Sequence, residues 1–179
     1  LRTFISHALK NNTPVVCLAL DPQDNQFKPR LLTDVHEMAY IPGSIYHSTS
    51  FVGAIDLIRQ AIRPILLVAI PCQLSGILQY IANHEKDLAS QIKLICGLVC
   101  GWMYSYHSLK AFSKFKNISN PIFDLTTYRG GDEVGQLTIS TKNQQHDFER
   151  RKYKTLNDAI DYQSSFSTDF NRLRCRVCE

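Results

Sequence analysis

The sequence lacks the features that mark several common kinds of protein. Its net charge is only +4, and the basic residues cluster only near Arg150–Lys154 and Arg172–Arg176, which argues against the basic stripe of a nucleic-acid-binding protein. The apolar runs, such as Ile65–Ile70, are far shorter than the roughly 20 residues that cross a bilayer. Neither the dinucleotide fingerprint nor the P-loop occurs, and the histidines show no metal-ligand spacing. We therefore expect no nucleic-acid partner and no membrane span.

What is present fits an ordinary globular domain. Of the 179 residues, 44% are hydrophobic and 20% are charged, which is enough to build one core. The six cysteines occur in a long chain that needs no disulfide framework, so we expect a reducing, cytoplasmic location. The chain begins at Leu1 and stops one residue after Cys178. We interpret residues 1–179 as a single domain and as a piece of a longer protein.

Helices and strands alternate in the hydrophobic pattern, which predicts an α/β fold. The expected helices are Leu1–Lys10, a short helix capped by Thr33 that extends through Tyr40, Phe51–Ile62, Leu74–Ala82, Ser105–Phe115 and Leu156–Phe166. In Phe51–Ile62 we expect Ile62 to face the core together with Ile55, Leu57 and Ile58. The expected strands are Pro14–Leu20, Ile65–Ile70, Ile92–Val99, Ile122–Tyr128 and Gly135–Ser140, with Asp24–Arg30 as a loop. The last two strands form a late β-hairpin. The sheet is therefore mixed but mostly parallel, is flanked by helices, and is followed by an irregular tail, Asp169–Glu179, that carries cysteines.

Four cysteines are placed where they could serve one site. Cys72 and Cys100 lie at the carboxyl ends of Ile65–Ile70 and Ile92–Val99, which we expect to be the two most buried strands, covered on both faces. Ligands gather at such strand ends in open α/β sheets. Cys175 and Cys178 form a C-x-x-C, a spacing shared by iron–sulfur and zinc sites. Spacing alone leaves three alternatives open, namely an iron–sulfur cluster, a zinc site, or small core residues. Cys17 and Cys96 lie within strands, and we expect them to be packing residues.

Two glycine-containing turns are further candidates. Gly43-Ser44 and Arg129-Gly130-Gly131 would let backbone N–H groups approach a phosphate, and an arginine donates bidentate hydrogen bonds to such a group. Ordinary tight turns are the alternative interpretation.

Five short motifs occur together in the order seen in one known family. They are Gly43-Ser44-Ile45-Tyr46, Ile70-Pro71-Cys72-Gln73, Cys100-Gly101, Tyr128-Arg129-Gly130 and Arg174-Cys175-Arg176-Val177-Cys178. Through these motifs and their order, the chain resembles the coenzyme F-420 hydrogenase/dehydrogenase beta-subunit family, which includes the 7-hydroxymethyl chlorophyll a reductases. The resemblance extends from the Ala8-Leu9 helix to Cys178.

The resemblance implies an enzyme, a flavin and iron–sulfur oxidoreductase module. It would bind FAD and a four-iron, four-sulfur cluster. It would pass electrons between a two-electron donor, such as a deazaflavin coenzyme, and one-electron carriers. The cluster ligands implied by the motifs are Cys72, Cys100, Cys175 and Cys178. The residues implied near the flavin or the substrate coenzyme are Gly43, Ser44, Tyr46, Pro71, Gln73, Tyr128, Arg129 and Gly130.

The implied partners are a redox coenzyme or other small substrate and an electron-carrier protein such as a ferredoxin, within a homo- or hetero-oligomer. Two other functions stay open. One is a non-catalytic module in which the four cysteines bind structural zinc and fix the tail to the sheet. The other is a degenerate family member that acts in glycan or cell-surface biosynthesis without redox turnover.

Overall fold

The structure, a computed structural model, describes residues 1–100, 103–130 and 136–149 and divides into two compact units. Unit 1 comprises Leu1–Pro42 and Thr49–Cys100, and unit 2 comprises Gly43–Ser48 and Gly101–Glu179. Each unit is described by itself, so the single domain over residues 1–179 stays a prediction. The expected helix Leu156–Phe166 and the cysteine-bearing tail lie outside the described residues.

Unit 1 is built on a four-stranded sheet in the order β2-β1-β3-β4. Its strands are β1 (Val15–Asp21), β2 (Gln26–Leu32), β3 (Ile65–Ala69) and β4 (Ile92–Gly97), and its helical elements are α1 (Arg2–Lys10), η1 (Val35–Tyr40), α2 (Ala54–Gln60), α3 (Pro71–His84) and η2 (Lys86–Gln91). β1, β3 and β4 are parallel, whereas β2 pairs with β1 in antiparallel register. The mixed, mostly parallel sheet expected from the sequence is confirmed, but its antiparallel strand is β2, because the late hairpin belongs to a separate sheet.

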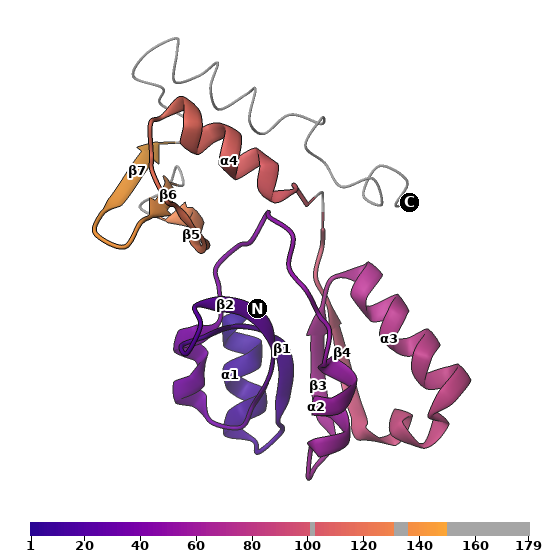
Figure 1. Cartoon of the computed structure of the whole chain (residues 1–179). Coiled ribbons are helices and arrows are strands. Elements are labelled where there is room, and N and C mark those ends of the chain that lie inside the picture. The colour runs from indigo at the N-terminus through magenta and orange to yellow at the C-terminus, as the bar shows by residue number, and fades with distance from the viewer. Residues whose placement is uncertain (101–102, 131–135, 150–179) are drawn as a thin grey trace. The chain divides into compact units, whose positions relative to one another are not determined.

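Helices cover both faces of this sheet, because successive side chains of each strand point to opposite sides. On one face, Val16 and Leu67 pack with α2 and α3 around Ile58 and Ile77. On the other face, strand residues such as Val15 and Leu66 pack with α1 through Ile5 and Leu9 and form a second core. α1 and α3 accordingly lie on opposite sides of the sheet in Figure 1.

Three sequence-based expectations for unit 1 are wrong. Gln26–Leu32 is a strand rather than a loop, because its backbone pairs with β1 throughout, and Pro29 is tolerated there because β2 is an edge strand. α3 begins at Pro71 rather than at Leu74, since proline suits the first position of a helix. Ile62, expected in the core, is 98% exposed because α2 ends at Gln60 and the backbone turns extended at Ala61.

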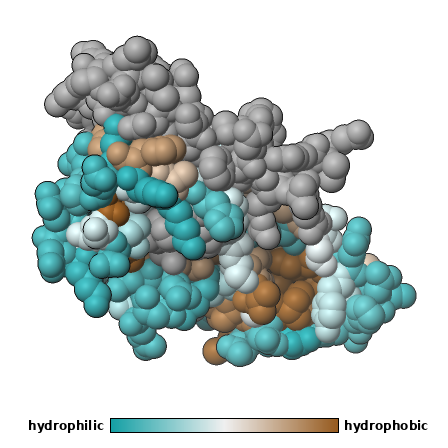
Figure 2. Space-filling view, turned by 45° about the horizontal axis from the view of Figure 1, so that its top comes forward, coloured by the Kyte–Doolittle hydropathy of each residue, from teal (hydrophilic) through white to brown (hydrophobic). Residues whose placement is uncertain are grey.

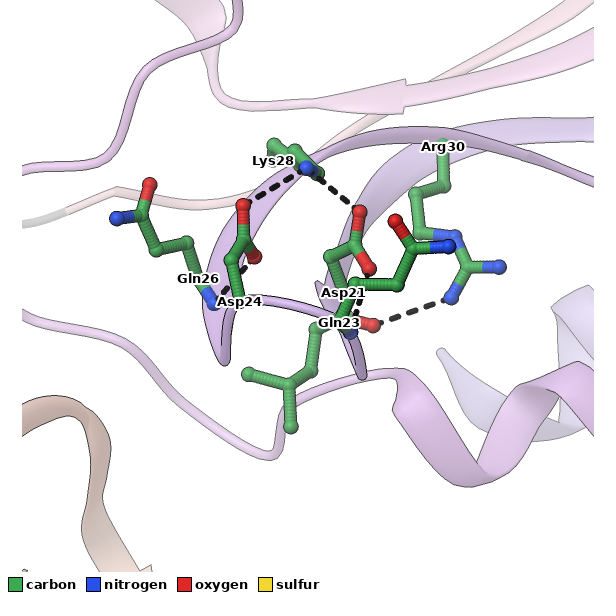
Figure 3. Close-up of polar contacts among 7 residues, drawn as sticks. Asp21, Gln23, Asp24, Gln26, Lys28 and Arg30 are labelled. Atoms are coloured by element: carbon green, nitrogen blue, oxygen red, sulfur yellow. Dashed lines mark hydrogen bonds and ion pairs between the residues drawn. The ribbon is translucent and has the colours of Figure 1, made fainter.

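The β1–β2 hairpin is closed by a small polar network, drawn in Figure 3. Lys28 Nζ lies 2.6 Å from a carboxylate oxygen of Asp21 and 3.0 Å from one of Asp24. The backbone N–H of Gln23 donates to Asp21, and Asn25 takes the left-handed conformation that the turn needs. The hydrogen bond from Lys28 lowers the pKa of Asp21, and the same bond raises the pKa of Lys28.

Over its described residues, unit 2 combines one helix with a three-stranded antiparallel sheet. It contains α4 (Tyr106–Phe115), β5 (Ile122–Gly130), β6 (Gln136–Ser140) and β7 (Gln145–Glu149). β5 and β6 form the expected late hairpin, and β7 adds a strand that the sequence-based interpretation did not contain. The core of the unit joins helix residues to β5 and β6, with Leu109, Phe112, Tyr128, Leu137 and Ile139 among its members.

Unit 1 leaves apolar side chains exposed along its last strand. β4 ends the sheet order, and Leu94, Ile95 and the following Val99 are exposed. Figure 2 shows hydrophobic surface in brown on the face that it presents. Among the described residues, no helix has the length and apolar character needed to cross a bilayer.

Candidate functional site

The first part of the candidate site is the carboxyl edge of β3 and β4 in unit 1. These strands are parallel neighbours with Ala69 opposite Gly97, and the pairing continues beyond them because Leu98 N–H donates to Ala69 O at 2.9 Å. Cys72 lies three residues after Ala69, and Cys100 lies three residues after Gly97. Both thiol-bearing residues therefore follow the same edge of the sheet, at equivalent positions beyond paired strands.

The local structure around Cys72 is the first turn of α3. Pro71 occupies the first helical position and Cys72 the second. The side-chain oxygen of Gln73 accepts a hydrogen bond from the backbone N–H of Ile70 at 3.4 Å, which fixes the entry into the helix. Because a helix N-terminus carries partial positive charge, this position favours a negatively charged ligand atom such as a thiolate.

The accessibility of the cysteines separates the edge residues from the packing residues. Cys72 is half-buried and Cys100 is exposed, whereas Cys17 is buried within the sheet. Burial raises the pKa of the Cys17 thiol to about 12, which leaves it without reactive thiolate at neutral pH. Cys96 is half-buried and packs against the second core. These environments fit the expected packing roles of Cys17 and Cys96.

The second part of the candidate site lies in unit 2, where the Gly43–Ser48 segment meets β5. The rings of Tyr46 and Tyr128 form an edge-to-face pair with centroids 5.3 Å apart. His47 Nδ1 and the Tyr128 hydroxyl share a hydrogen bond of 2.9 Å. Two of the motifs singled out in the sequence, Gly43-Ser44-Ile45-Tyr46 and Tyr128-Arg129-Gly130, are thus brought together by direct side-chain contact.

Tyr128 and the Gly43–Tyr46 segment differ in how accessible they are to a ligand. Tyr128 is only 2% exposed, so its ring belongs to the core of unit 2. Gly43 is exposed, and Ser44 and Tyr46 are half-buried. Tyr128 therefore acts as an anchor that fixes the neighbouring backbone, while the Gly43–Tyr46 segment has the surface that a ligand can reach.

Main-chain contacts hold the same segment from its other side. Tyr104 N–H donates to Tyr46 O at 2.6 Å, His47 and Tyr104 form an isolated parallel bridge, and the Ser48 hydroxyl donates to Tyr104 O at 3.2 Å. His47 and Tyr104 were not among the site residues expected from the motifs. A histidine beside a glycine-serine turn was the available signal, but its partner lies 81 residues away in the sequence.

The expected site residues are divided between the two units. Pro71 and Gln73 belong to unit 1, whereas Tyr46, Tyr128 and Gly130 belong to unit 2. Cys175 and Cys178 lie outside the described residues, so their roles as ligands stay predictions. Within residues 1–100, 103–130 and 136–149, no group of three or more histidine, cysteine, aspartate or glutamate side chains is arranged to hold a metal ion.

The fold is shared with a solved redox enzyme. A chain of the F420-reducing NiFe hydrogenase complex from Methanosarcina barkeri superimposes with a TM-score of 0.64 at 13% sequence identity. The match covers 99% of this chain and 57% of that chain. The present chain thus spans little more than half the length of its structural neighbour, and at this identity the similarity concerns the fold. Among curated proteins, no sequence matches this chain.

The family match is more specific than the fold. The model for the C terminus of the coenzyme F420 hydrogenase/dehydrogenase beta subunit matches residues 62–179, which is more than half of the chain. The chain therefore belongs to the coenzyme F420 hydrogenase/dehydrogenase beta-subunit family. The resemblance found in the short motifs is thus confirmed.

Proposed function

We propose that this chain is a flavin- and iron–sulfur-dependent electron-transfer module. It would pass electrons between a two-electron donor, such as a deazaflavin coenzyme, and one-electron carriers. The observation that carries this proposal is the equivalent placement of Cys72 and Cys100 beyond the paired ends of β3 and β4. It is supported by membership of a family of hydrogenase and dehydrogenase beta subunits.

The proposed cluster ligands are Cys72 and Cys100 together with Cys175 and Cys178 of the C-x-x-C. The donor set fits an iron–sulfur cluster, since such clusters are held by four cysteine thiolates. The first turn of α3 favours negative charge at Cys72. Cys72 is half-buried and Cys100 is exposed, and the redox potential of a cluster depends on how far solvent reaches its ligand sulfurs.

The proposed flavin-binding residues of unit 2 lie in the segment that begins at Gly43 and at the end of β5, and they are Gly43, Ser44, Tyr46, Tyr128, Arg129 and Gly130. Pro71 and Gln73, which belong to unit 1, stay predictions as residues near the flavin or the substrate coenzyme. A flavin and a cluster, when bound, supply the conversion between two-electron and one-electron transfer. The chain would bind and orient these groups. Glycine at position 43 has open space where a side chain would begin, so a ligand can approach the backbone closely there.

The proposed partners follow from the same chemistry. A small redox coenzyme would be the two-electron partner, and a carrier such as a ferredoxin would be the one-electron partner. The structural neighbour comes from a hydrogenase complex, which supports assembly with other subunits. We also propose that the protein is cytoplasmic.

The deciding experiment is anaerobic purification of the full-length protein followed by quantification of iron, sulfide and flavin. We expect iron and acid-labile sulfide in equal amounts, together with flavin. Cys72→Ala, Cys100→Ala and Cys178→Ala should each lose most of the iron. Cys17→Ala is the matched control, because that thiol is buried in the sheet, and it should keep its iron.

The outcomes separate the alternatives. If the purified protein contains stoichiometric zinc and neither flavin nor sulfide, the electron-transfer function is refuted and a structural zinc site is favoured. Equal loss of metal in Cys17→Ala and Cys72→Ala would refute the ligand assignment, because the loss would then reflect general destabilisation. Protein that binds flavin and iron but reduces no dye with a deazaflavin or nicotinamide donor would refute the proposed activity.

A further inference from the structure

His47 and Tyr128 are ionisable side chains of unit 2 that are fully buried in the structure. His47 lies within the Gly43–Ser48 segment, and its Nδ1 and the Tyr128 hydroxyl are 2.9 Å apart. The two rings are also in contact, with centroids 5.7 Å apart. A buried imidazole is costly unless it is hydrogen-bonded, so a histidine at this position is stable only while it keeps a polar partner.

The contact links two parts of the chain that are far apart in the sequence. On one side, backbone contacts join Tyr46 and His47 to Tyr104. On the other side, the His47 imidazole reaches β5 at Tyr128, directly before Arg129-Gly130. The Tyr46 ring packs edge-on against the same Tyr128 ring. His47 and Tyr128 therefore fix the turn containing Gly43 and Ser44 relative to the end of β5.

We propose that His47 is a positioning residue, which acts through the Tyr128 hydroxyl to fix the Gly43–Tyr46 segment against β5 so that a flavin can bind there. The role in flavin binding rests on the function proposed above, whereas the fixing of the segment does not. His47 itself is fully buried, so it reaches the ligand only through the residues that it holds.

The structure provides closely matched variants for the test. His47→Asn keeps a polar atom near the place of Nδ1, and His47→Leu has a similar shape to asparagine without hydrogen-bonding groups. Tyr128→Phe removes only the hydroxyl. If His47 acts through that hydroxyl, then His47→Leu, Tyr128→Phe and the double variant will have the same effect, and His47→Asn will stay close to the wild type.

The first measurement is backbone hydrogen exchange in the full chain without added flavin. We expect exchange in peptides covering residues 43–48 to become about tenfold faster in His47→Leu, in Tyr128→Phe and in the double variant, as the loss of one buried hydrogen bond allows. Exchange in β3 of unit 1 and in β6 of unit 2 should not change, which shows that both units of each variant are folded. Additive effects of the two substitutions, or no effect of His47→Leu, would overturn the proposal.

The second measurement is titration of each variant with FAD, followed by flavin fluorescence. We expect the FAD dissociation constant to rise about tenfold in the same three variants and to be restored by His47→Asn. If exchange changes as expected but FAD affinity does not, the positioning role in flavin binding is overturned. If the wild type binds no FAD, the proposed function fails, and the exchange data alone decide whether His47 fixes the segment.

Discussion

The two units of the molecule bury different kinds of side chain. The two cores of unit 1 lie on opposite faces of its sheet and consist mostly of aliphatic side chains. Val16 and Leu67 belong to one core, and Leu66 belongs to the other. All five polar side chains that are buried among the described residues belong to unit 2, namely His47, Ser108, Ser113, Thr126 and Ser140. A buried polar group lowers the stability of a core unless it is hydrogen-bonded, so its presence calls for an explanation such as a functional role.

This difference indicates a division of labour. Unit 1 is a layered scaffold whose proposed cluster ligands, Cys72 and Cys100, follow an edge of the sheet rather than lying inside it. Unit 2 places its candidate site residues, Tyr46 and Tyr128, within and beside its core. Substitutions in the core of unit 1 should therefore lower stability, whereas substitutions of buried polar groups in unit 2 should change stability in either direction.

The largest expected effect is at the centre of the unit 1 sheet. Leu67 in β3 is completely buried, so Leu67→Ala removes buried methyl groups and leaves a cavity, with a loss of about 2–5 kcal/mol in the free energy of unfolding. Urea unfolding followed by circular dichroism measures it. Leu94→Ala is the control, because Leu94 lies on the edge strand and is exposed, and its cost should be within about 0.5 kcal/mol. Similar losses at both positions would contradict the scaffold role of the core.

The next largest effect concerns thiol reactivity in unit 1. At pH 7.5 and without bound metal, a thiol reagent should label Cys17 at least about a hundredfold more slowly than Cys72, because burial raises the Cys17 pKa to about 12 and hides the sulfur. Mass spectrometry of labelled peptides measures both rates. The same raised pKa predicts that stability falls as the pH rises above about 9. Equal labelling rates in the folded protein would show that the sheet opens readily around Cys17.

A smaller effect of opposite sign is expected in unit 2. The Thr126 hydroxyl is buried and has no hydrogen-bond partner among the described residues. Thr126→Val keeps the shape of the side chain and removes this unpaired group, so the free energy of unfolding should rise by about 1 kcal/mol.

Thr127→Val is the control for this prediction, because the neighbouring Thr127 is exposed and its substitution should change stability little. Thermal and urea unfolding of both variants measure the difference. If Thr126→Val destabilises the protein, the hydroxyl has a partner in the intact molecule, and the polar groups of unit 2 are more fully satisfied than the described residues indicate.

The smallest effect is expected at the exposed hairpin of unit 1. The hydrogen bond from Lys28 lowers the pKa of Asp21 below its usual value, so this carboxylate stabilises the folded state above about pH 4 and loses its contribution as the pH falls further. Asp21→Asn should therefore reduce the melting temperature slightly at pH 7 and by less at pH 3. Asp87→Asn, at an exposed position without an ion pair among the described residues, is the control. A loss in Asp21→Asn that is independent of pH would contradict the ion-pair explanation.

The sequence was most informative where one local signal agreed with the tertiary structure. The apolar run Ile65–Ile70 predicted β3, and the turn signals around Arg129-Gly130 predicted the β5–β6 hairpin. The positions of Cys72 and Cys100 after apolar strands predicted a common edge, because parallel neighbouring strands end on the same side. Family membership was also readable from five short motifs, and the family match confirms it.

Other features were not readable because they depend on partners distant in the sequence. Gln26–Leu32 has a polar, proline-containing pattern, and only pairing with β1 makes it a strand. Ile92–Val99 was expected to be covered on both faces, but β4 ends the sheet and leaves Leu94 and Ile95 exposed. The hydrogen bond of His47 with Tyr128 joins segments with no local signal between them.

The amino-acid sequence alone determined the alternation of helices and strands, the mixed sheet and the family, because hydrophobic periodicity and short motifs are local properties of a chain. The tertiary structure decided which strand is at the edge, which cysteines share an edge and which tyrosine is an anchor. Those properties depend on burial and on contacts between segments that are distant in the sequence, and such contacts form only when the chain folds.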